Sequence, residues 1–545
     1  MKKNLIFLVV FLILLKLGIS FFIQVPLGFA DSFYYFEEAK SFFDNPSLAS
    51  IATSGTYPPF YPMLISPAFI FSDMNLVFFF IKLIGIILSS LVIIPAYLIS
   101  KEFFNEKKSI MISLIISIIP DAFIFSFYAF SENIIFTLFL FTVYFLLKSF
   151  TEKKIKWEIL SGIFIGLCIL TRIISIFLLP VIFFLILIYL FRENKKMLFL
   201  RNKLLLLLAL LATLLPWIIT KIILNGFSLI GIFGYTNSIN KISGPFFLLN
   251  KIIWTFFYID YLIISLGIIF FILSVYLLFK YKYLNQKERL FLDLTFLSTI
   301  FVILIAANHS GAFEHYNDYR ILGRYISVLF PLFIILGFIA LEKYQSFPKK
   351  LVLAVSSFLA ITTPFIIYNL FFPANNSSWI SIGILKYILE IFTVHSTIII
   401  TLVIIILSLS LILIKKLNFK YLTSFFLIYF FSLSLLSSAV IVYDSQYRWL
   451  NLEQVQLGFW INENLKKDAN YLIDIDDKKN YTATISEDPS KPKDRPITII
   501  AYWIRGSVKE DNISNYQNYD YVISTKNLNL SKIKEGDSIK IYKTK

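Results

Sequence analysis

The residues that could do chemistry are concentrated in one short segment that follows the first apolar stretch. Asp31, Tyr35 and Ala39 are spaced by four residues in DSFYYFEEA (31–39), so a helix would place them on one face. The aromatic and proline-rich sequence YPPFYPMLISP (57–67) follows. A carboxylate fixed where a membrane helix leaves the bilayer, above many apolar helices, suggests chemistry on a lipid-borne substrate.

The composition identifies a polytopic membrane protein. Hydrophobic residues make up 58% of the 545 residues and charged residues only 15%, whereas soluble proteins carry roughly 25% charge. Apolar runs of about 20 residues recur along the chain, and each is long enough to cross a bilayer as a helix. The first run has no clear cleavage site before Asp31, so we expect a retained helix instead of a removed signal peptide.

The charge and the cysteine content exclude several classes of protein. The net charge is +16, yet residues 444–545 contain 16 Lys+Arg and 15 Asp+Glu. The excess therefore lies in the membrane part, where it marks cytoplasmic loops and does not indicate a nucleic-acid partner. The single Cys168 excludes an intramolecular disulfide, and a multi-histidine metal site would need nearly all of the three histidines.

Apolar runs that alternate with basic loops predict an α-helical protein with about thirteen membrane helices. We expect them at 4–26, 76–99, 109–126, 129–148, 157–172, 173–191, 203–224, 255–279, 290–307, 324–341, 351–372, 396–414 and 421–443. Every second connection is basic, which predicts a cytoplasmic N-terminus and an extracytoplasmic C-terminus in the cell membrane. We divide the run 157–191 at Arg172, because a single helix about 52 Å long is too long for a bilayer.

The composition changes abruptly at Asp444. Residues 444–545 are expected to form a small extracytoplasmic α/β domain, and residues 1–443 the transmembrane domain with a catalytic first outer loop at 27–75. LEQVQLGFWINENLKK (452–467) is typical of an amphipathic helix. Strands are expected at 471–476, 497–504, 519–525 and 538–543.

Six short sequences, in this order and spacing, resemble the type-C superfamily of polyprenyl-phosphate-sugar-dependent glycosyltransferases. They are DSFYYFEEA (31–39), YPPFYPMLISP (57–67), SENIIFTLFL (131–140), GLCILTRIISIFLLP (166–180), LLPWII (214–219) and ILGRYISVLFPLFIILG (321–337). The chain is most similar to the branch of protein O-mannosyltransferases and lipid A aminoarabinose transferases. The resemblance implies transfer of a hexose or pentose from a polyprenyl or dolichyl phosphate, such as dolichyl phosphate mannose, to an acceptor on the outer face.

Two carboxylates match acidic positions of that superfamily. Asp31 matches the carboxylate of the first outer loop, which implies a general base that takes a proton from the attacking hydroxyl or amine. The alternative is a helix N-cap, a position that Asp favours. Glu132 matches the second acidic position and could orient the acceptor, bind a cation or set the pKa of Asp31, or be an ordinary first-turn residue. The sequence departs from the O-mannosyltransferases at Ser32, where they have an acidic neighbour.

The resemblance also implies a leaving lipid phosphate, which needs cations at the outer membrane boundary. Arginine binds phosphate oxygens in pairs, although an arginine beside an apolar run can also extend to lipid headgroups. Tyr57 stands where the superfamily often has a donor-binding lysine, so phosphate binding must be redistributed. The substrate-binding candidates are Tyr35, Tyr57, Arg172, Arg320, Arg324 and Tyr325.

The remaining polar motifs are expected to be structural. His309, Glu314 and His315 in NHSGAFEHYNDYR (308–320) fit a solvated loop better than a zinc site. Asp121 follows Pro120 and is expected in a loop, and the N-x-S sequences at 375–378 are common by chance. We assign no metal ligands and no cofactor, and the sequence leaves a divalent cation open.

The rival function is a transporter or flippase of lipid-linked sugars. Transporters usually show repeated halves or broken helices near the midplane, and neither is visible in the sequence. For the glycosyltransferase we expect a lipid-phosphate sugar donor, a protein, lipid or glycan acceptor, contact with membrane lipid and no nucleic acid.

Overall fold

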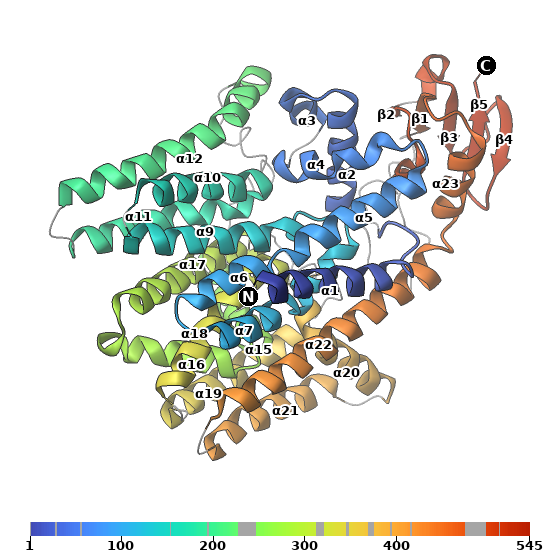
Figure 1. Cartoon of the computed structure of the whole chain (residues 1–545). Helices are drawn as coiled ribbons and strands as arrows, with labels where there is room; N and C mark the ends of the chain where they lie inside the picture. Colours follow the sequence, from blue (N-terminus) through green and yellow to red (C-terminus); the bar gives the residue numbers. More distant parts are fainter. Residues whose placement is uncertain are drawn as a thin grey trace.

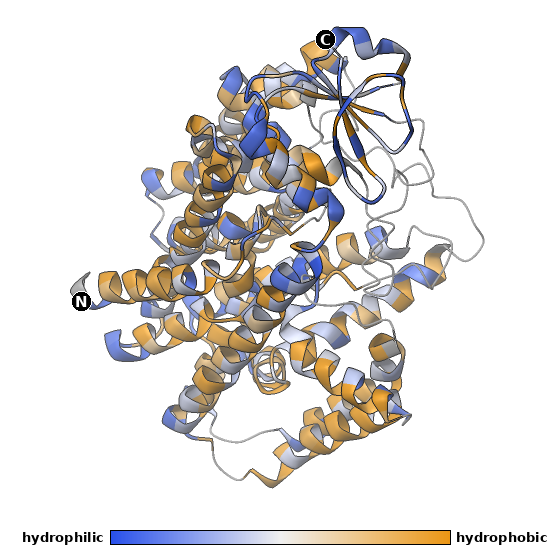
Figure 2. Ribbon diagram, turned by 90° about the vertical axis from the view of Figure 1, so that its right-hand side faces the viewer, coloured by the Kyte–Doolittle hydropathy of each residue, from blue (hydrophilic) through white to orange (hydrophobic). Residues whose placement is uncertain are grey.

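The computed structural model describes most of the chain. The described residues are 2–27, 30–54, 57–152, 154–192, 196–226, 247–311, 321–344, 348–368, 375–392, 395–414, 417–474, 497–511 and 513–544. Most of them form a broad bundle of helices, and the five strands gather at one end of it beside the C-terminus (Figure 1). The bundle is mainly apolar, whereas the sheet carries many polar residues (Figure 2).

The bundle contains the helices expected from the apolar runs and one that was not expected, α20. They are α1 (Lys2–Ser20), α5 (Met74–Ser90), α6 (Ile93–Lys101), α7 (Glu106–Ser117), α8 (Pro120–Ile124), α9 (Glu132–Glu152), α10 (Ile155–Thr171), α11 (Leu178–Leu190), α12 (Lys196–Asn225), α15 (Phe247–Ser265), α16 (Ile269–Phe279), α17 (Gln286–Gly311), α18 (Phe330–Lys343), α19 (Lys349–Tyr368), α20 (Ile380–Ile391), α21 (Ser396–Ser410) and α22 (Phe419–Tyr443). The chain is thus a multi-pass membrane protein.

Each of the thirteen expected segments contains a helix, but the count of thirteen crossings is not confirmed. In the described residues, nine helical stretches are long and apolar enough to cross a membrane, or ten if the bent pair α7 and α8 is one span. The difference comes from short and broken helices. The pair α7 and α8 bends by 69°, at a proline that restricts the preceding residue, and α18 has only 14 residues.

The expected helix 255–279 is also broken, which corrects that prediction. Gly267 and Ile268 both have a φ of 64° and separate α15 from α16. A side chain at Gly267 would collide with the ring of Phe426, so the close approach of α22 needs glycine there as well as the backbone angle.

The division of the run 157–191 agrees with the structure. Helix α10 ends at Thr171, Arg172 is extended with φ −153° and ψ 122°, and a 3₁₀ turn at Ile173–Phe177 leads into α11. Helix α10 packs between α9 and α12, and α11 packs against α17 (Figure 1). The backbone of Arg172 therefore lies between two helices at one end of the bundle.

The first loop after α1 folds into three short helices and a 3₁₀ turn. They are α2 (Ala30–Asp44), α3 (Leu48–Ser54), α4 (Phe60–Ile65) and the turn at Ser66–Ile70. As the spacing predicts, α2 buries one face, which includes Tyr35 and Ala39. That face packs on α4 and the following turn, so the helix is fixed against the bundle by apolar contacts.

The C-terminal residues form a small α/β unit. Helix α22 continues through a π-helical turn at Asp444–Trp449, and α23 (Glu453–Asn464) confirms the expected amphipathic helix. The strands are β1 (Tyr471–Asp474), β2 (Val508–Asp511), β3 (Tyr521–Ser524), β4 (Ser531–Glu535) and β5 (Lys540–Lys543). Their order is β2-β1-β3-β5-β4, with β1 parallel to β2 and β3, and β5 antiparallel to β3 and β4.

The expected strand at 497–504 is wrong. Residues Ile497–Trp503 form 3₁₀ turns, and the described side chains from Ile499 to Ile504 are all buried. A short, continuous apolar run does not reveal its own secondary structure, because it has no polar face to set a period. This run is buried between α23 and the loop helix α2, so neither of its sides meets solvent.

Candidate active site

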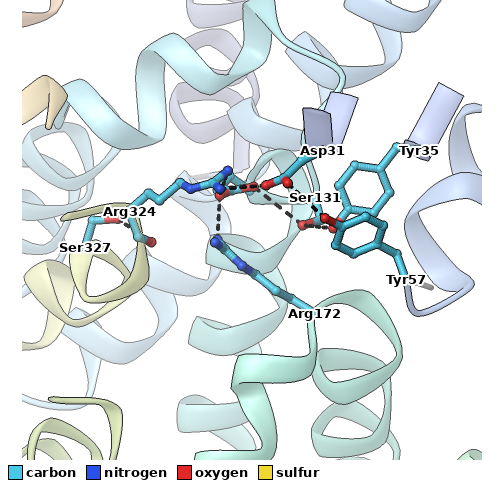
Figure 3. Close-up of polar contacts among 8 residues, drawn as sticks. Asp31, Tyr35, Tyr57, Ser131, Arg172, Arg324 and Ser327 are labelled. Atoms are coloured by element: carbon cyan, nitrogen blue, oxygen red, sulfur yellow. Dashed lines mark hydrogen bonds and ion pairs between the residues drawn. The ribbon is translucent and has the colours of Figure 1, made fainter. Parts of the chain in front are cut away.

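The candidate site is assembled from four separate parts of the chain. Asp31 lies in the first turn of α2, Glu132 begins α9, Arg172 joins α10 to α11, and Arg324 lies in a 3₁₀ turn at Gly323–Tyr325. Their side chains converge at one end of the bundle (Figure 3). Asp31 is the second residue of α2 and not its N-cap, although the helix dipole favours a carboxylate there.

Two carboxylates and two guanidinium groups alternate in this cluster. Arg324 Nη2 lies 2.6 Å from Asp31 Oδ2, and its Nη1 lies 3.5 Å from Glu132 Oε1. Arg172 Nη1 lies 2.6 Å from the same oxygen of Glu132. The side chain of Glu132 is only 2% exposed, whereas that of Asp31 is 26% exposed. Glu132 is therefore the buried carboxylate that pairs with both arginines, and Asp31 is the carboxylate that solvent can reach.

Tyrosines complete the walls of the cluster. The Tyr57 hydroxyl donates to Asp31 Oδ1 at 2.9 Å, and the Tyr35 hydroxyl donates to Ser131 Oγ, also at 2.9 Å. The Tyr325 ring lies against both guanidinium groups, with its centroid 5.1 Å from Cζ of Arg172 and 5.8 Å from Cζ of Arg324. The structure thus brings together every candidate residue except Arg320, which lies outside the described residues.

The backbone around Arg324 is held by the segment that precedes α20. The Arg324 amide donates to the carbonyl of Asn375 at 3.1 Å, and the Gly323 amide donates to the side-chain oxygen of Asn376 at 3.3 Å. Both asparagines are buried. Their N-x-S sequences therefore do not present an accessible amide for glycosylation, and the segment positions Arg324.

The electrostatics favour an ionised Asp31. Burial alone would raise the pKa of Asp31, but the charge of Arg324 and the hydrogen bonds from Tyr57 and Arg324 outweigh burial and lower it. The carboxylate is thus present at neutral pH. It is a weak base while Arg324 stays paired with it, because a lower pKa means a lower proton affinity.

The sequence assigned Asp121 to a loop, and the structure corrects this. Asp121 is fully buried in the first turn of α8, and one of its oxygens accepts a hydrogen bond from Ser378. Glu314 and His315 lie outside the described residues. Within the described part of the chain no three His, Cys, Asp or Glu side chains are grouped as a metal site requires, and Asp31 and Glu132 are both engaged by arginine.

Sequence reasoning missed Glu38, which supports Tyr57. The backbone amide of Tyr57 donates to Glu38 Oε1 at 3.1 Å, and Glu38 is fully buried. Two adjacent glutamates in a helix give no signal that distinguishes an inward-facing carboxylate from a solvated one. The one available signal was that Glu38 directly precedes Ala39 and so lies on the buried side of α2.

Glu38 predicts a specific dependence of stability on pH. Burial raises its pKa from 4.5 to about 8, against the smaller effect of the Tyr57 hydrogen bond. Between pH 4.5 and about pH 8, Glu38 therefore keeps its proton in the native state and loses it in the unfolded state. The contribution of Glu38 to the free energy of unfolding is complete below pH 4.5 and decreases as the pH rises towards 8. Because Glu38→Gln cannot ionise, we expect its Tm relative to the wild type to rise between pH 5 and pH 8. Glu463→Gln, at an exposed position, is the control. A Tm difference between Glu38→Gln and the wild type that stays constant from pH 5 to pH 8 would contradict this prediction.

Comparison with known proteins finds similarity in part of the sequence and in the fold. The sequence model described as dolichyl-phosphate-mannose-protein mannosyltransferase matches residues 57–219. The resemblance to the type-C glycosyltransferases is confirmed. No curated protein matches the chain in sequence.

Solved structures extend the likeness to the whole fold. ArnT from Cupriavidus metallidurans bound to undecaprenyl phosphate matches with a TM-score of 0.60 and 12% identity, over 99% of this chain and 98% of that chain. The apo form of the same protein matches with a TM-score of 0.59 and 11% identity over the same shares. At this identity the likeness concerns the fold, and family model and fold together point to the type-C glycosyltransferases.

Proposed function

We propose that this protein is an integral-membrane glycosyltransferase that moves one sugar from a polyprenyl or dolichyl phosphate carrier to an acceptor on the outer face of the membrane. The observation that carries the proposal is the cluster of Asp31, Glu132, Arg172 and Arg324. It combines a partly exposed carboxylate with two adjacent guanidinium groups. Transfer of a sugar from a lipid phosphate needs both, a base for the acceptor and cations for the leaving phosphate.

The arginines would bind the leaving group better than the donor. In the donor, the phosphate bridges the lipid and the sugar and carries one negative charge; the released lipid phosphate carries nearly two. Arg172 and Arg324 are fixed by Glu132 before substrate arrives. Cations held in place against a charge that grows during the reaction stabilise the transition state more than the ground state.

Arg324 links donor binding to the state of the base. Its Nε is buried and has no hydrogen-bond partner in the described residues, so the guanidinium group has an unused donor that a small shift of the side chain would turn towards a phosphate oxygen. A phosphate bound there would compete with Asp31 for the guanidinium charge. The pKa of Asp31 would then rise, because less of the Arg324 charge would act on it, so Asp31 becomes a better base when the donor is in place.

The chemical step is a single displacement. The acceptor hydroxyl or amine gives its proton to Asp31 and attacks the anomeric carbon, and the bond from that carbon to the phosphate oxygen breaks. The electron pair stays on the lipid phosphate, which leaves towards Arg172 and Arg324. One displacement inverts the anomeric centre. Tyr57 keeps Asp31 oriented through its hydroxyl, and Tyr35, Tyr325 and Arg320 belong to the proposed substrate site.

The lipid tail of the donor has an apolar surface next to the cations. A cavity of about 360 Å³ lies between the Ile173–Phe177 turn, α11 and α17, and it begins four residues after Arg172. Its apolar lining includes Phe177, Pro180 and Phe301. The first prenyl units would lie there while the phosphate meets the arginines.

The proposed sidedness gives a labelling prediction. Ser531 in β4 is exposed, and the native Cys168 is buried. A cysteine at Ser531→Cys should therefore react with an impermeant thiol reagent in intact cells. A cysteine at Lys107→Cys, which is exposed in an expected cytoplasmic loop, should react only after lysis. The opposite pattern would overturn the outer-face site.

The proposed activity is tested with purified protein and a panel of polyprenyl-phosphate sugars. The readout is free polyprenyl phosphate, which forms when the bond between the sugar and the phosphate is broken. We expect release that depends on the added acceptor for at least one donor. If the protein instead moved intact lipid-linked sugar across proteoliposome membranes without cleavage, the transferase proposal would be wrong.

A further inference from the structure

The C-terminal unit makes several contacts with α2, the helix that carries Asp31; these contacts are called the grip below. The contacting segment is Tyr502–Gly506, which begins with the last two residues of the 3₁₀ turns at Ile497–Trp503 and ends shortly before β2. In Figure 1 the red C-terminal unit lies beside the blue helices of the first loop. The residues in contact are more than 450 positions apart in the chain.

Lys40 is the buried centre of this grip. Its side chain is 6% exposed, and its Nζ donates to the carbonyl of Ile504 at 3.1 Å and to that of Gly506. Burial lowers the pKa of Lys40, and the carboxylate of Glu37 acts in the opposite direction. A buried ammonium is tolerated only if it is hydrogen-bonded, so these two carbonyls and Lys40 depend on one another.

Arg505 adds a second contact, at the C-terminal end of α2. Its two terminal nitrogens lie 2.8 and 3.3 Å from the two oxygens of Asp44, which is the paired geometry that arginine forms with carboxylates. The guanidinium group also lies 5.5 Å from the ring of Phe43 and 5.8 Å from that of Phe69. Arg505 is therefore packed as well as paired.

Tyr502 is the part of the segment that comes nearest to the catalytic end of α2. Its ring meets those of Phe33 and Phe36 edge to face, with centroids 5.5 and 5.0 Å away. Burial raises the pKa of Tyr502, and the negative charges of Glu37 and Asp31 raise it further. The ring thus packs against α2 within the field of Asp31.

A separate contact holds the far end of the first loop. Asn462 in α23 accepts from the amide of Met74 at 3.0 Å and donates to Asp73 at 2.9 Å. These residues begin α5. The C-terminal unit is therefore attached to both ends of the folded loop, and α2 cannot turn about its axis without breaking contacts to Tyr502–Gly506.

We infer that the segment Tyr502–Gly506 is a positioning element of the active site: through Lys40 and Asp44 it fixes the rotation and height of α2, so that Asp31 faces the attacking group. The inference rests on the proposed function of Asp31. Small displacements of a catalytic group are costly, since about 1 Å can reduce a rate about 100-fold. Among the contacts between described residues, none joins Tyr502–Gly506 to Arg172 or Arg324.

The test compares Lys40→Met with Lys509→Met in the full-length protein. Methionine keeps the length and packing of lysine but cannot donate to the carbonyls of Ile504 and Gly506. Lys509 is 67% exposed on β2, so the same substitution there controls for loss of charge. Three quantities are measured: amide hydrogen exchange of residues 31–44, kcat for sugar transfer, and the KM for the lipid donor.

We expect Lys40→Met to speed exchange in α2 and to lower kcat at least tenfold, with the donor KM within twofold of the wild type. Lys509→Met should change none of the three. If Lys40→Met does not fold, Asp44→Asn serves, because Asp44 is half exposed and its loss costs little stability; we expect the same direction with a smaller change.

Two results would overturn the inference. The first is a folded Lys40→Met protein in which amide exchange in α2 is faster but kcat is unchanged. The second is a Lys40→Met protein in which amide exchange in α2 is unchanged. Failure of the proposed function looks different, because the wild-type protein itself would then release no carrier phosphate from any donor.

Discussion

The substitution Asp31→Asn is expected to lower kcat by about two orders of magnitude or more, because it removes the proton acceptor; it also removes the charge that pairs with Arg324. Asparagine has the size of aspartate, and its side-chain oxygen can still accept the hydrogen bond from Tyr57. Arg324 keeps Glu132 as a neighbour at 3.5 Å. Donor binding should therefore survive, since the phosphate contacts proposed for Arg172 and Arg324 remain.

The measurement is kcat and donor KM for the Asn variant beside its Tm. Asp468→Asn, an exposed aspartate of the C-terminal unit, is the matched control and should behave like the wild type. A well-folded Asp31→Asn protein with near-normal transfer would refute the general-base assignment. Glu132 would then be the next carboxylate to test, although its burial between two arginines suits it better for holding them.

The second large effect is expected at Arg324. Arg324→Lys keeps the charge but offers one nitrogen where guanidinium offers three, so it cannot reach Asp31, Glu132 and a phosphate together. Since a hydrogen bond to a charged group contributes about 1.5–3 kcal/mol, we expect kcat/KM for the donor to fall roughly 10- to 100-fold.

The pH profile separates this role from a structural one. The charge of Arg324 lowers the pKa of Asp31 in the absence of substrate. A lysine pairs less closely with Asp31, so the pKa of Asp31 rises. Because activity requires ionised Asp31, acidifying the solution then abolishes activity at a higher pH than in the wild type. The acid limb of kcat/KM should therefore shift upwards in Arg324→Lys and stay in place in the exposed Arg448→Lys. An unchanged profile and unchanged donor kinetics would assign Arg324 to lipid headgroups.

Most of the site's members could be found from sequence because each carries its own local signal. Asp31 and Glu132 follow or begin apolar runs, and Arg172 interrupts one. Such signals report on charge in an apolar context and need no knowledge of contacts. They do not report which carboxylate pairs with which arginine, and so the link between Asp31 and Arg324, 293 residues apart, came only from the structure.

The supporting residues were missed for the same reason. Glu38, Asn376 and Lys40 look like ordinary polar residues of a loop helix or turn, and their roles exist only through partners on distant segments. The helices were predictable because hydrophobic length is a property of a single segment. Their breaks were not, since the turn at Gly267–Ile268 depends on packing against Phe426 as much as on glycine itself.

The grip of Tyr502–Gly506 on α2 also sets an order of events during synthesis. A ribosome makes α2 among the first residues and the gripping segment only after every membrane helix described here has been made. Until then, α2 has no partner for Lys40, and Asp31 stands on a helix that can turn. Since chains fold progressively as they emerge, a growing or stalled chain would insert its helices and bring the arginines together yet remain a poor catalyst. Activity would appear late, once the last-made part has folded onto α2.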